Sequence, residues 1–205
     1  LNYCRQFDTY RTDQTQKQWH PRKPLLAEDL GIGIMGLGQL GADAAKKLSY
    51  LGFTVAGWSR RPKEIPGAHC FAGEAELAEF LSRSHILICL LPLTAATKGI
   101  LNRKIFSRLP SGAYVINVAR GKHLNEKDLI AALDSGQLAG ACLDVFEVEP
   151  LPQDHPFWSH PHIKVTPHIS SLTFPKAVAP QIIENYQRTK TGNPLLHVVD
   201  VERGY

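Results

Sequence analysis

Short apolar runs alternate along this chain with segments in which apolar residues recur at helical spacing. The runs are bounded by glycine, proline or polar residues and have the lengths of strands buried on both faces. Such alternation is typical of an α/β fold in which crossover helices cover a doubly wound parallel sheet. We expect strands at residues 33–35, 53–58, 68–71, 85–91, 114–117, 139–143 and 163–166, and helices at 39–51, 74–82, 104–109, 125–133 and 174–190.

Glycines with the spacing G-x-G-x-x-G follow the first expected strand, at Gly36, Gly38 and Gly41. Gly36 permits a sharp turn, Gly38 lets the backbone approach a pyrophosphate, and Gly41 lets the next helix pack closely on the strand. The N-terminus of that helix offers free N–H groups and a positive dipole end to phosphates. In this strand–turn–helix context, the motif predicts a Rossmann-type dinucleotide-binding domain.

The loop after the second expected strand is basic. An Asp or Glu about 20 residues past the glycines would hydrogen-bond the ribose 2′-hydroxyl of NAD. That position is Ser59 or Arg60 here, and Arg61 and Lys63 follow. A guanidinium offers two donors to a 2′-phosphate, whereas a carboxylate would repel it. The loop therefore favours NADP(H) over NAD(H), with NAD(H) still possible and a solvated loop without a ligand as the alternative.

Chemically useful side chains come directly after the later strands, where ligands of open parallel sheets bind. Arg120 could clamp a carboxylate through two parallel hydrogen bonds, although a surface arginine is the alternative. Asp144 ends a buried strand and so needs a specific partner. His168 follows the last strand, and a carboxylate such as Glu149 would fix its tautomer and favour its protonated form, which suits a general acid.

Together, these groups describe hydride transfer to a 2-oxo acid. The hydride passes from the nicotinamide to C2 while His168 protonates the carbonyl oxygen. Arg120 orients the substrate and stabilises charge that develops on that oxygen.

Composition narrows the class of protein further. The 205 residues are 43% hydrophobic and 20% charged, as in ordinary globular proteins, and a net charge of +4 is too small to indicate nucleic-acid binding. The cysteines lack metal-ligand spacing, and Cys89 and Cys142 lie in apolar runs, which favours buried free thiols in a reducing compartment. We expect no metal site, no membrane segment and a cytoplasmic location.

Five segments, in order, resemble the sequence signatures of the D-2-hydroxyacid dehydrogenase family. They are Gly36–Gly41, Leu90–Thr94, Asn117–Gly121, Leu143–Pro150 and Thr166–Ile169. Ordered motifs over some 140 residues are far more specific than the glycine motif alone. Two further segments, 58–60 and 199–205, are similar to the bacterial branch that reduces glyoxylate and hydroxypyruvate with NADPH.

The resemblance implies a role for each site residue. Arg120 would bind the substrate carboxylate and carbonyl, Glu149 would pair with His168, and His168 would be the acid/base. Asp144 would hold the nicotinamide carboxamide, and residues 37–40 would present backbone to the pyrophosphate. The full set predicted to bind the cofactor is Gly36, Leu37, Gly38, Gln39, Leu40, Gly41, Ser59, Arg60, Arg61, Leu91, Pro92, Val118, Ala119, Arg120, Asp144, His168 and Ser170.

The resemblance also implies a second domain. Family members carry a flavodoxin-like substrate domain built mostly from residues that precede the nucleotide-binding domain. Roughly the first hundred of those residues are missing here. We therefore predict three parts. Residues 1–24 form a lead-in helix or linker that lies on the domain or on a partner, and residues 25–171 form the NAD(P)-binding Rossmann domain. Residues 172–205 form a C-terminal helix and tail that return towards the substrate domain. A homodimer through the nucleotide-binding domain is a further expectation. A cofactor-binding sensor, as among the family's corepressors, and a truncated NADP-binding module without turnover remain alternatives.

Overall fold

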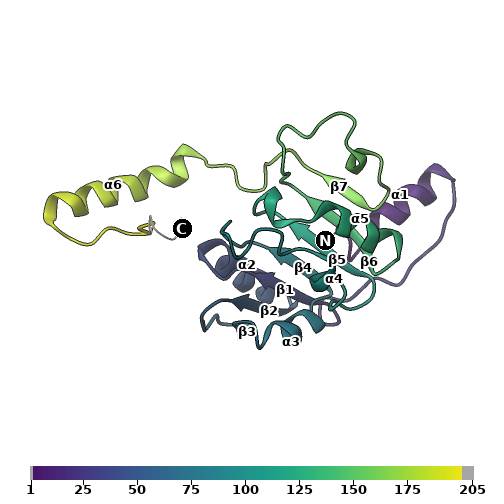
Figure 1. Cartoon of the computed structure of the whole chain (residues 1–205), viewed down its shortest axis with the longest axis horizontal. Coiled ribbons are helices and arrows are strands. Elements are labelled where there is room, and N and C mark those ends of the chain that lie inside the picture. The colour runs from purple at the N-terminus through teal and green to yellow at the C-terminus, as the bar shows by residue number, and fades with distance from the viewer. Residues whose placement is uncertain (1, 200–205) are drawn as a thin grey trace.

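A seven-stranded sheet with helices on both faces forms the body of the chain, in a computed structural model that describes residues 2–199 (Figure 1). All strands are parallel and their order is β3-β2-β1-β4-β5-β6-β7. This arrangement confirms the predicted Rossmann-type doubly wound sheet. The strands are β1 (Gly31–Met35), β2 (Thr54–Ser59), β3 (Ala68–Ala72), β4 (Ile86–Cys89), β5 (Ala113–Asn117), β6 (Leu138–Leu143) and β7 (Ile163–Val165).

The expected helices are present, most of them with ends shifted by a few residues. They are α2 (Gln39–Tyr50), α3 (Leu77–Ser82), α4 (Arg103–Phe106), α5 (Glu126–Asp134) and α6 (Pro175–Thr191), joined by α1 (Phe7–Thr15) in the lead-in segment. Asn125 caps α5, because its side chain accepts a hydrogen bond from the Asp128 N–H at 3.1 Å. Two short 3₁₀ helices, η1 (Gly121–His123) and η2 (Pro156–Trp158), were not expected.

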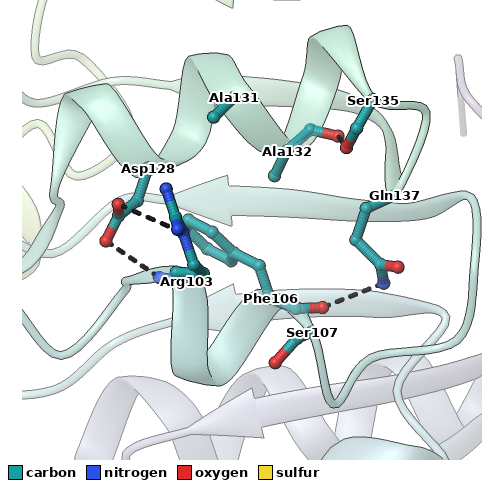
Figure 2. Close-up of a pocket in the computed structure, with 8 residues that line it drawn as sticks. All are labelled: Arg103, Phe106, Ser107, Asp128, Ala131, Ala132, Ser135 and Gln137. Carbon is teal, nitrogen blue, oxygen red and sulfur yellow. Dashed lines mark hydrogen bonds and ion pairs between the residues drawn. The ribbon is translucent and has the colours of Figure 1, made fainter.

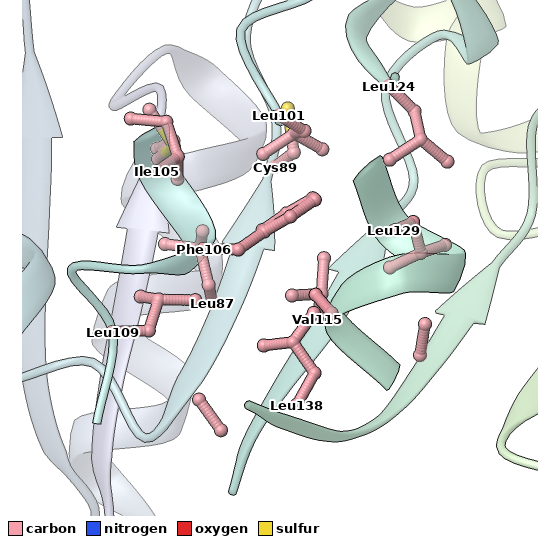
Figure 3. Close-up of a cluster of buried hydrophobic side chains, with 14 of the residues drawn as sticks. Leu87, Cys89, Leu101, Ile105, Phe106, Leu109, Val115, Leu124, Leu129 and Leu138 are labelled. Atoms are coloured by element: carbon pink, nitrogen blue, oxygen red, sulfur yellow. The ribbon is translucent and has the colours of Figure 1, made fainter. Parts of the chain in front are cut away.

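Alternation of side chains along the strands produces a core on each face of the sheet. Ile32 and Ile34 of β1 are buried on the face that α2 covers. The other face packs against α3, α4 and α5, and Figure 3 shows Leu87 and Cys89 of β4 beside Phe106 of α4 in this cluster. Cys89 is fully buried as expected, whereas Cys142 is only partly buried and packs at the border of the cluster on the α2 face.

The lead-in segment lies against the sheet rather than away from it. The Asp8 carboxylate and the Lys164 ammonium form an ion pair at 2.6 Å, which joins α1 to β7, and the two elements lie side by side in Figure 1. The Tyr3 hydroxyl donates to the Gly112 carbonyl at 3.0 Å, and its ring centroid lies 4.8 Å from that of Tyr114. Of the two expected positions of this segment, the structure therefore shows the one on the domain.

Helix α6 extends away from the body of the chain (Figure 1). None of its residues is buried, and Ile182, Ile183 and Tyr186 are all more than half exposed. Within residues 2–199, no helix is long and apolar enough to cross a membrane. The division of the chain into domains at residues 24 and 171 stays a prediction. Residues 1 and 200–205 lie outside the described residues, and with them most of the 199–205 motif.

Candidate active site

The glycine turn after β1 has space for a ligand at one position only. Gly36 has φ 103°, and a Cβ there would lie 2.6 Å from the Leu90 carbonyl oxygen, so no other residue fits. A Cβ at Gly41 would collide with the Gly36 carbonyl. A Cβ at Gly38 would meet nothing within 4 Å, and its φ of −70° is ordinary. The protein's own packing explains Gly36 and Gly41, whereas Gly38 borders open space.

That open space lies at the N-terminus of α2. Gly38 is the N-cap, and no side chain caps the helix there. The first N–H groups of a helix carry a partial positive charge and bind phosphate when they lack a cap. The turn therefore has the geometry of an anion-binding site, and the assignment of residues 37–40 to the pyrophosphate stays a prediction.

The basic loop after β2 is fastened to this turn. The Lys63 ammonium donates to the Leu37 carbonyl oxygen at 2.6 Å, which joins the loop to the glycine turn. Ser59 is buried, and its hydroxyl donates to the Arg61 carbonyl oxygen at 2.7 Å. Arg60 and Arg61 are exposed, and no ion pair involves either of them among the described residues. The sequence identified this loop but not the contact made by Lys63.

The turn after β5 is held by a buried asparagine. Asn117 is 0% exposed; its Nδ2 donates to the Arg120 carbonyl oxygen at 3.1 Å, and its Oδ1 accepts from the Ala119 N–H at 3.2 Å. The Arg120 side chain is exposed, and its Nη1 donates to the Ala119 carbonyl oxygen at 2.6 Å. Asn117 therefore fixes the backbone from which the Arg120 guanidinium projects.

His123 is a buried polar residue that the sequence did not single out. Its imidazole is 0% exposed, with Nδ1 3.2 Å from the Arg120 carbonyl oxygen and Nε2 3.3 Å from the Pro92 carbonyl oxygen. Burial lowers the pKa of His123 below its ordinary value, although both carbonyls act in the opposite direction. Nothing in the local sequence Gly-Lys-His distinguishes it from the chain's eight other histidines.

Asp144 is buried, forms no ion pair within residues 2–199, and accepts hydrogen bonds from four donors. Its Oδ1 accepts from the Thr166 hydroxyl at 2.5 Å and the Ile169 N–H at 3.0 Å, and its Oδ2 accepts from the Ser170 N–H at 2.8 Å and hydroxyl at 2.6 Å. Burial alone would raise the pKa of Asp144, yet the four donors together hold it at about 2. The sequence expectation of a specific partner is met by hydroxyls and backbone.

Glu149 and His168 are in direct contact. His168 Nδ1 lies 2.8 Å from Glu149 Oε2, and the other carboxylate oxygen accepts from the Phe146 N–H at 2.8 Å. The hydrogen bond from His168, assisted by that from Phe146, holds the pKa of Glu149 below its ordinary value. An ionised carboxylate can only accept, so Nδ1 carries the hydrogen and Nε2 is free to face a substrate. His168 also has φ 54°, a left-handed conformation that is rare outside glycine.

The loops after β5 and β6 press directly on one another. A Cβ at Gly121 would collide with the main chain of Phe146, so only glycine allows this approach. Arg120 therefore lies one residue from a turn packed against the loop that carries Glu149. No hydrogen bond links Arg120 to Glu149 or His168, all of which are described, so the predicted pair of His168 with Glu149 forms without Arg120.

A hollow of about 340 Å³ lies elsewhere, between α4 and α5 (Figure 2). Arg103 and Asp128 form one side of it, with the Arg103 N–H 3.0 Å from the Asp128 carboxylate. Gln137 lies on the other side and donates to the Phe106 carbonyl oxygen at 2.9 Å. None of the predicted site residues lines this hollow, so it is separate from the strand-end surface.

The fold and the open glycine turn define the chain as a dinucleotide-binding domain. The family described as D-isomer specific 2-hydroxyacid dehydrogenase, NAD binding domain, matches residues 1–170. The chain therefore belongs to the D-isomer specific 2-hydroxyacid dehydrogenase family, which confirms the resemblance found in its five motifs.

Relatives match the whole of the chain. The glyoxylate/hydroxypyruvate reductase A of Yersinia enterocolitica is 49% identical over 205 residues, which are all of this chain and 66% of that protein. The protein of the same name from Serratia proteamaculans is 50% identical over the same share. The chain thus spans about two thirds of the length of these curated relatives.

Solved structures of relatives have the same fold. A D-isomer specific 2-hydroxyacid dehydrogenase from Xanthobacter autotrophicus, in complex with NADPH and MES, superposes with a TM-score of 0.95 at 47% identity, over 100% of this chain and 85% of that one. An NADPH-dependent glyoxylate/hydroxypyruvate reductase from Sinorhizobium meliloti, in complex with NADP and sulfate, has a TM-score of 0.95 at 40% identity, over 100% and 66% of the two chains.

Proposed function

We propose that the protein to which this chain belongs reduces small 2-oxo acids with NADPH, glyoxylate to glycolate and hydroxypyruvate to D-glycerate. The contact between His168 and Glu149 at the strand ends is the observation that carries this proposal. The names of the Yersinia and Sinorhizobium relatives support the substrates, and the NADP bound by the Sinorhizobium protein supports the cofactor.

Backbone and basic side chains would hold the cofactor. The turn at Gly38 leaves room for the pyrophosphate, and Arg60 and Arg61 are exposed where a 2′-phosphate could meet them. When bound, the nicotinamide supplies the hydride. Asp144 would reach the nicotinamide carboxamide only by sharing an oxygen that already accepts two hydrogen bonds.

The chain's own side chains would donate the proton to the substrate and bind the substrate's negative charge. Because Glu149 holds Nδ1 of His168, Nε2 is the atom that holds the proton taken up by the substrate's carbonyl oxygen. Arg120 would bind the substrate carboxylate with its guanidinium, which must first leave the Ala119 carbonyl. The loops that carry both groups are held by the hydrogen bonds of Asn117 and Asp144, so the reorganisation is confined to the Arg120 side chain.

A substrate panel on the complete natural polypeptide tests the proposal. We expect NADPH oxidation with glyoxylate and hydroxypyruvate, and much slower oxidation of NADH. NADPH binding without turnover of any small 2-oxo acid would instead indicate a sensor or a cofactor-binding module. We further propose that the protein is cytoplasmic and forms a homodimer through this domain, which sedimentation at several concentrations would test.

A further inference from the structure

We propose that His123 is a positioning residue that sets the distance between the cofactor side and the substrate side of the active site. The inference rests on the proposed function, because it concerns residues assigned there to the cofactor and to the substrate. His123 belongs to η1, which directly follows Arg120, and its ring reaches the loop after β4.

The two ring nitrogens face two loops. Nδ1 lies 3.2 Å from the carbonyl oxygen of Arg120, the residue proposed to bind the substrate carboxylate. Nε2 lies 3.3 Å from the carbonyl oxygen of Pro92, in the loop predicted to line the cofactor. The imidazole is 0% exposed, so no solvent separates it from either carbonyl. One rigid ring therefore spans the gap between the two loops.

Neither carbonyl needs this histidine for a hydrogen bond. The Arg120 carbonyl oxygen also accepts from Asn117 Nδ2 at 3.1 Å, and the Pro92 carbonyl oxygen accepts from the Thr97 hydroxyl at 2.7 Å. A neutral imidazole has a single N–H and can donate to only one of the two carbonyls. Burying a polar ring is costly compared with an aliphatic side chain. Apolar packing alone therefore does not account for a histidine at this position. A rigid ring of defined length, with a nitrogen at each end, would serve as a spacer between the two loops.

The position of η1 extends the effect to the acid/base loop. Its main chain is fastened to the segment before α4, because the Leu101 N–H donates to the His123 carbonyl oxygen at 2.9 Å. Its first residue, Gly121, presses on the main chain of Phe146, whose N–H holds Glu149. A displacement of the His123 ring would therefore move Arg120 relative to Pro92 and disturb the packing beneath Glu149.

Replacing the imidazole by an aromatic ring without nitrogens, which is somewhat larger, tests this role. In the complete natural polypeptide, His123→Phe should raise KM for glyoxylate and lower kcat, each by about tenfold, since a misplaced clamp costs about one hydrogen bond. The Kd for NADPH, measured by fluorescence titration, should change less than KM, because the glycine turn is untouched. His123→Gln, which retains one donor, should recover part of both losses, which a purely structural role would not predict.

A matched control is His160→Phe. His160 lies just before β7, at the amino end of that strand and away from the carboxyl ends where the proposed site lies, and its Nε2 is 3.5 Å from Asp134 Oδ1. This variant should keep the parent kinetics. Parent values of KM and kcat for a folded His123→Phe or His123→Gln protein would overturn the inference, as would failure of both variants to fold. If the parent polypeptide itself reduces no 2-oxo acid, it is the proposed function that fails.

Discussion

The two sides of the strand-end surface are built differently. On the β1–β2 side, the groups available to a ligand are backbone at Gly38 and exposed basic side chains such as Arg60. On the β5–β7 side, Asn117, His123 and Asp144 are at most 1% exposed, and each lies within hydrogen-bonding distance of at least two groups. The β1–β2 side therefore offers a ligand exposed backbone and side chains. On the β5–β7 side, hydrogen bonds within the protein already fix the polar groups before any ligand binds.

This difference between the two sides predicts different effects of substitution: on ligand binding for the exposed groups, and on the position of the active-site loops for the buried ones. Exposed residues usually change the free energy of unfolding by no more than about 0.5 kcal/mol when replaced. Buried polar networks are sensitive to the loss of any member, because the remaining partners stay desolvated. Substitutions on the β1–β2 side should therefore change cofactor binding alone, whereas those on the β5–β7 side should change turnover or stability.

The largest expected effect is that of His168→Ala. Loss of the general acid should lower kcat for glyoxylate by roughly 10²–10⁴-fold. The Kd for NADPH should stay nearly unchanged, because the phosphates bind at the other side of the surface. Steady-state kinetics and fluorescence titration measure the two quantities. A loss of cofactor affinity as large as that of kcat would mean that His168 is structural and that the two sides are not separate.

Asp144→Asn should have the next largest effect, on stability. The folded pKa of about 2 lies below the ordinary value of 3.8, so the ionised carboxylate contributes roughly 2 kcal/mol to the free energy of unfolding. This contribution is complete above about pH 4 and is lost as the pH falls towards 2. Urea unfolding should show a gap between parent and variant near neutral pH that narrows below about pH 4.

Asp154→Asn is the matched control for that experiment, since Asp154 is exposed in the loop before η2. The control should match the parent at every pH. A constant gap for Asp144→Asn across the acid range would show that its charge is not what the four donors stabilise.

Arg60→Asp should reverse the cofactor preference at little cost in stability. A carboxylate repels the 2′-phosphate, so the Kd for NADPH should rise by about tenfold or more, while NADH binding is kept or improved. Arg108→Asp, at another exposed arginine, controls for the change in net charge. An unaltered preference would remove the basic loop from the cofactor site.

The smallest effect is expected from Lys63→Met. It breaks the hydrogen bond to the Leu37 carbonyl, and the Kd for NADPH should rise about threefold, as exposed charged contacts contribute less than about 1 kcal/mol. Lys98→Met at an exposed position should leave the Kd unchanged. A fall in the melting temperature for Lys63→Met alone would place this residue in the folding of the turn.

Much of this domain could be predicted because its signals are local. Gly36 and Gly41 reveal the turn, since Gly36 has a positive φ in its own backbone and a Cβ at Gly41 would collide with the Gly36 carbonyl five residues earlier. The apolar run at residues 85–91 reveals a central strand, since both faces of β4 are covered. Asp144 could be expected to find a partner because it ends such a strand, although Thr166 and Ser170 could not be named.

The residues that were missed depend on distant backbone. Pro92 precedes His123 by 31 positions, and the atom contacted is a carbonyl that every residue has, so no pattern of side chains marks the pair. The contact of Lys63 with the Leu37 carbonyl is hidden for the same reason. Helix α6 could be located from its length and spacing, but not its partner, because none of its residues is buried.

The order of the sheet has a consequence for how such a domain can change during evolution. Because the order reverses between β1 and β4, the whole β1–β2–β3 side comes from residues 31–72 and the β4–β7 side from residues 86–165. The residues proposed to bind the 2′-phosphate and those proposed to transfer the proton thus occupy consecutive, non-overlapping stretches of the gene. A single recombination event between them would exchange the basic loop after β2 and leave Arg120, Glu149 and His168 intact.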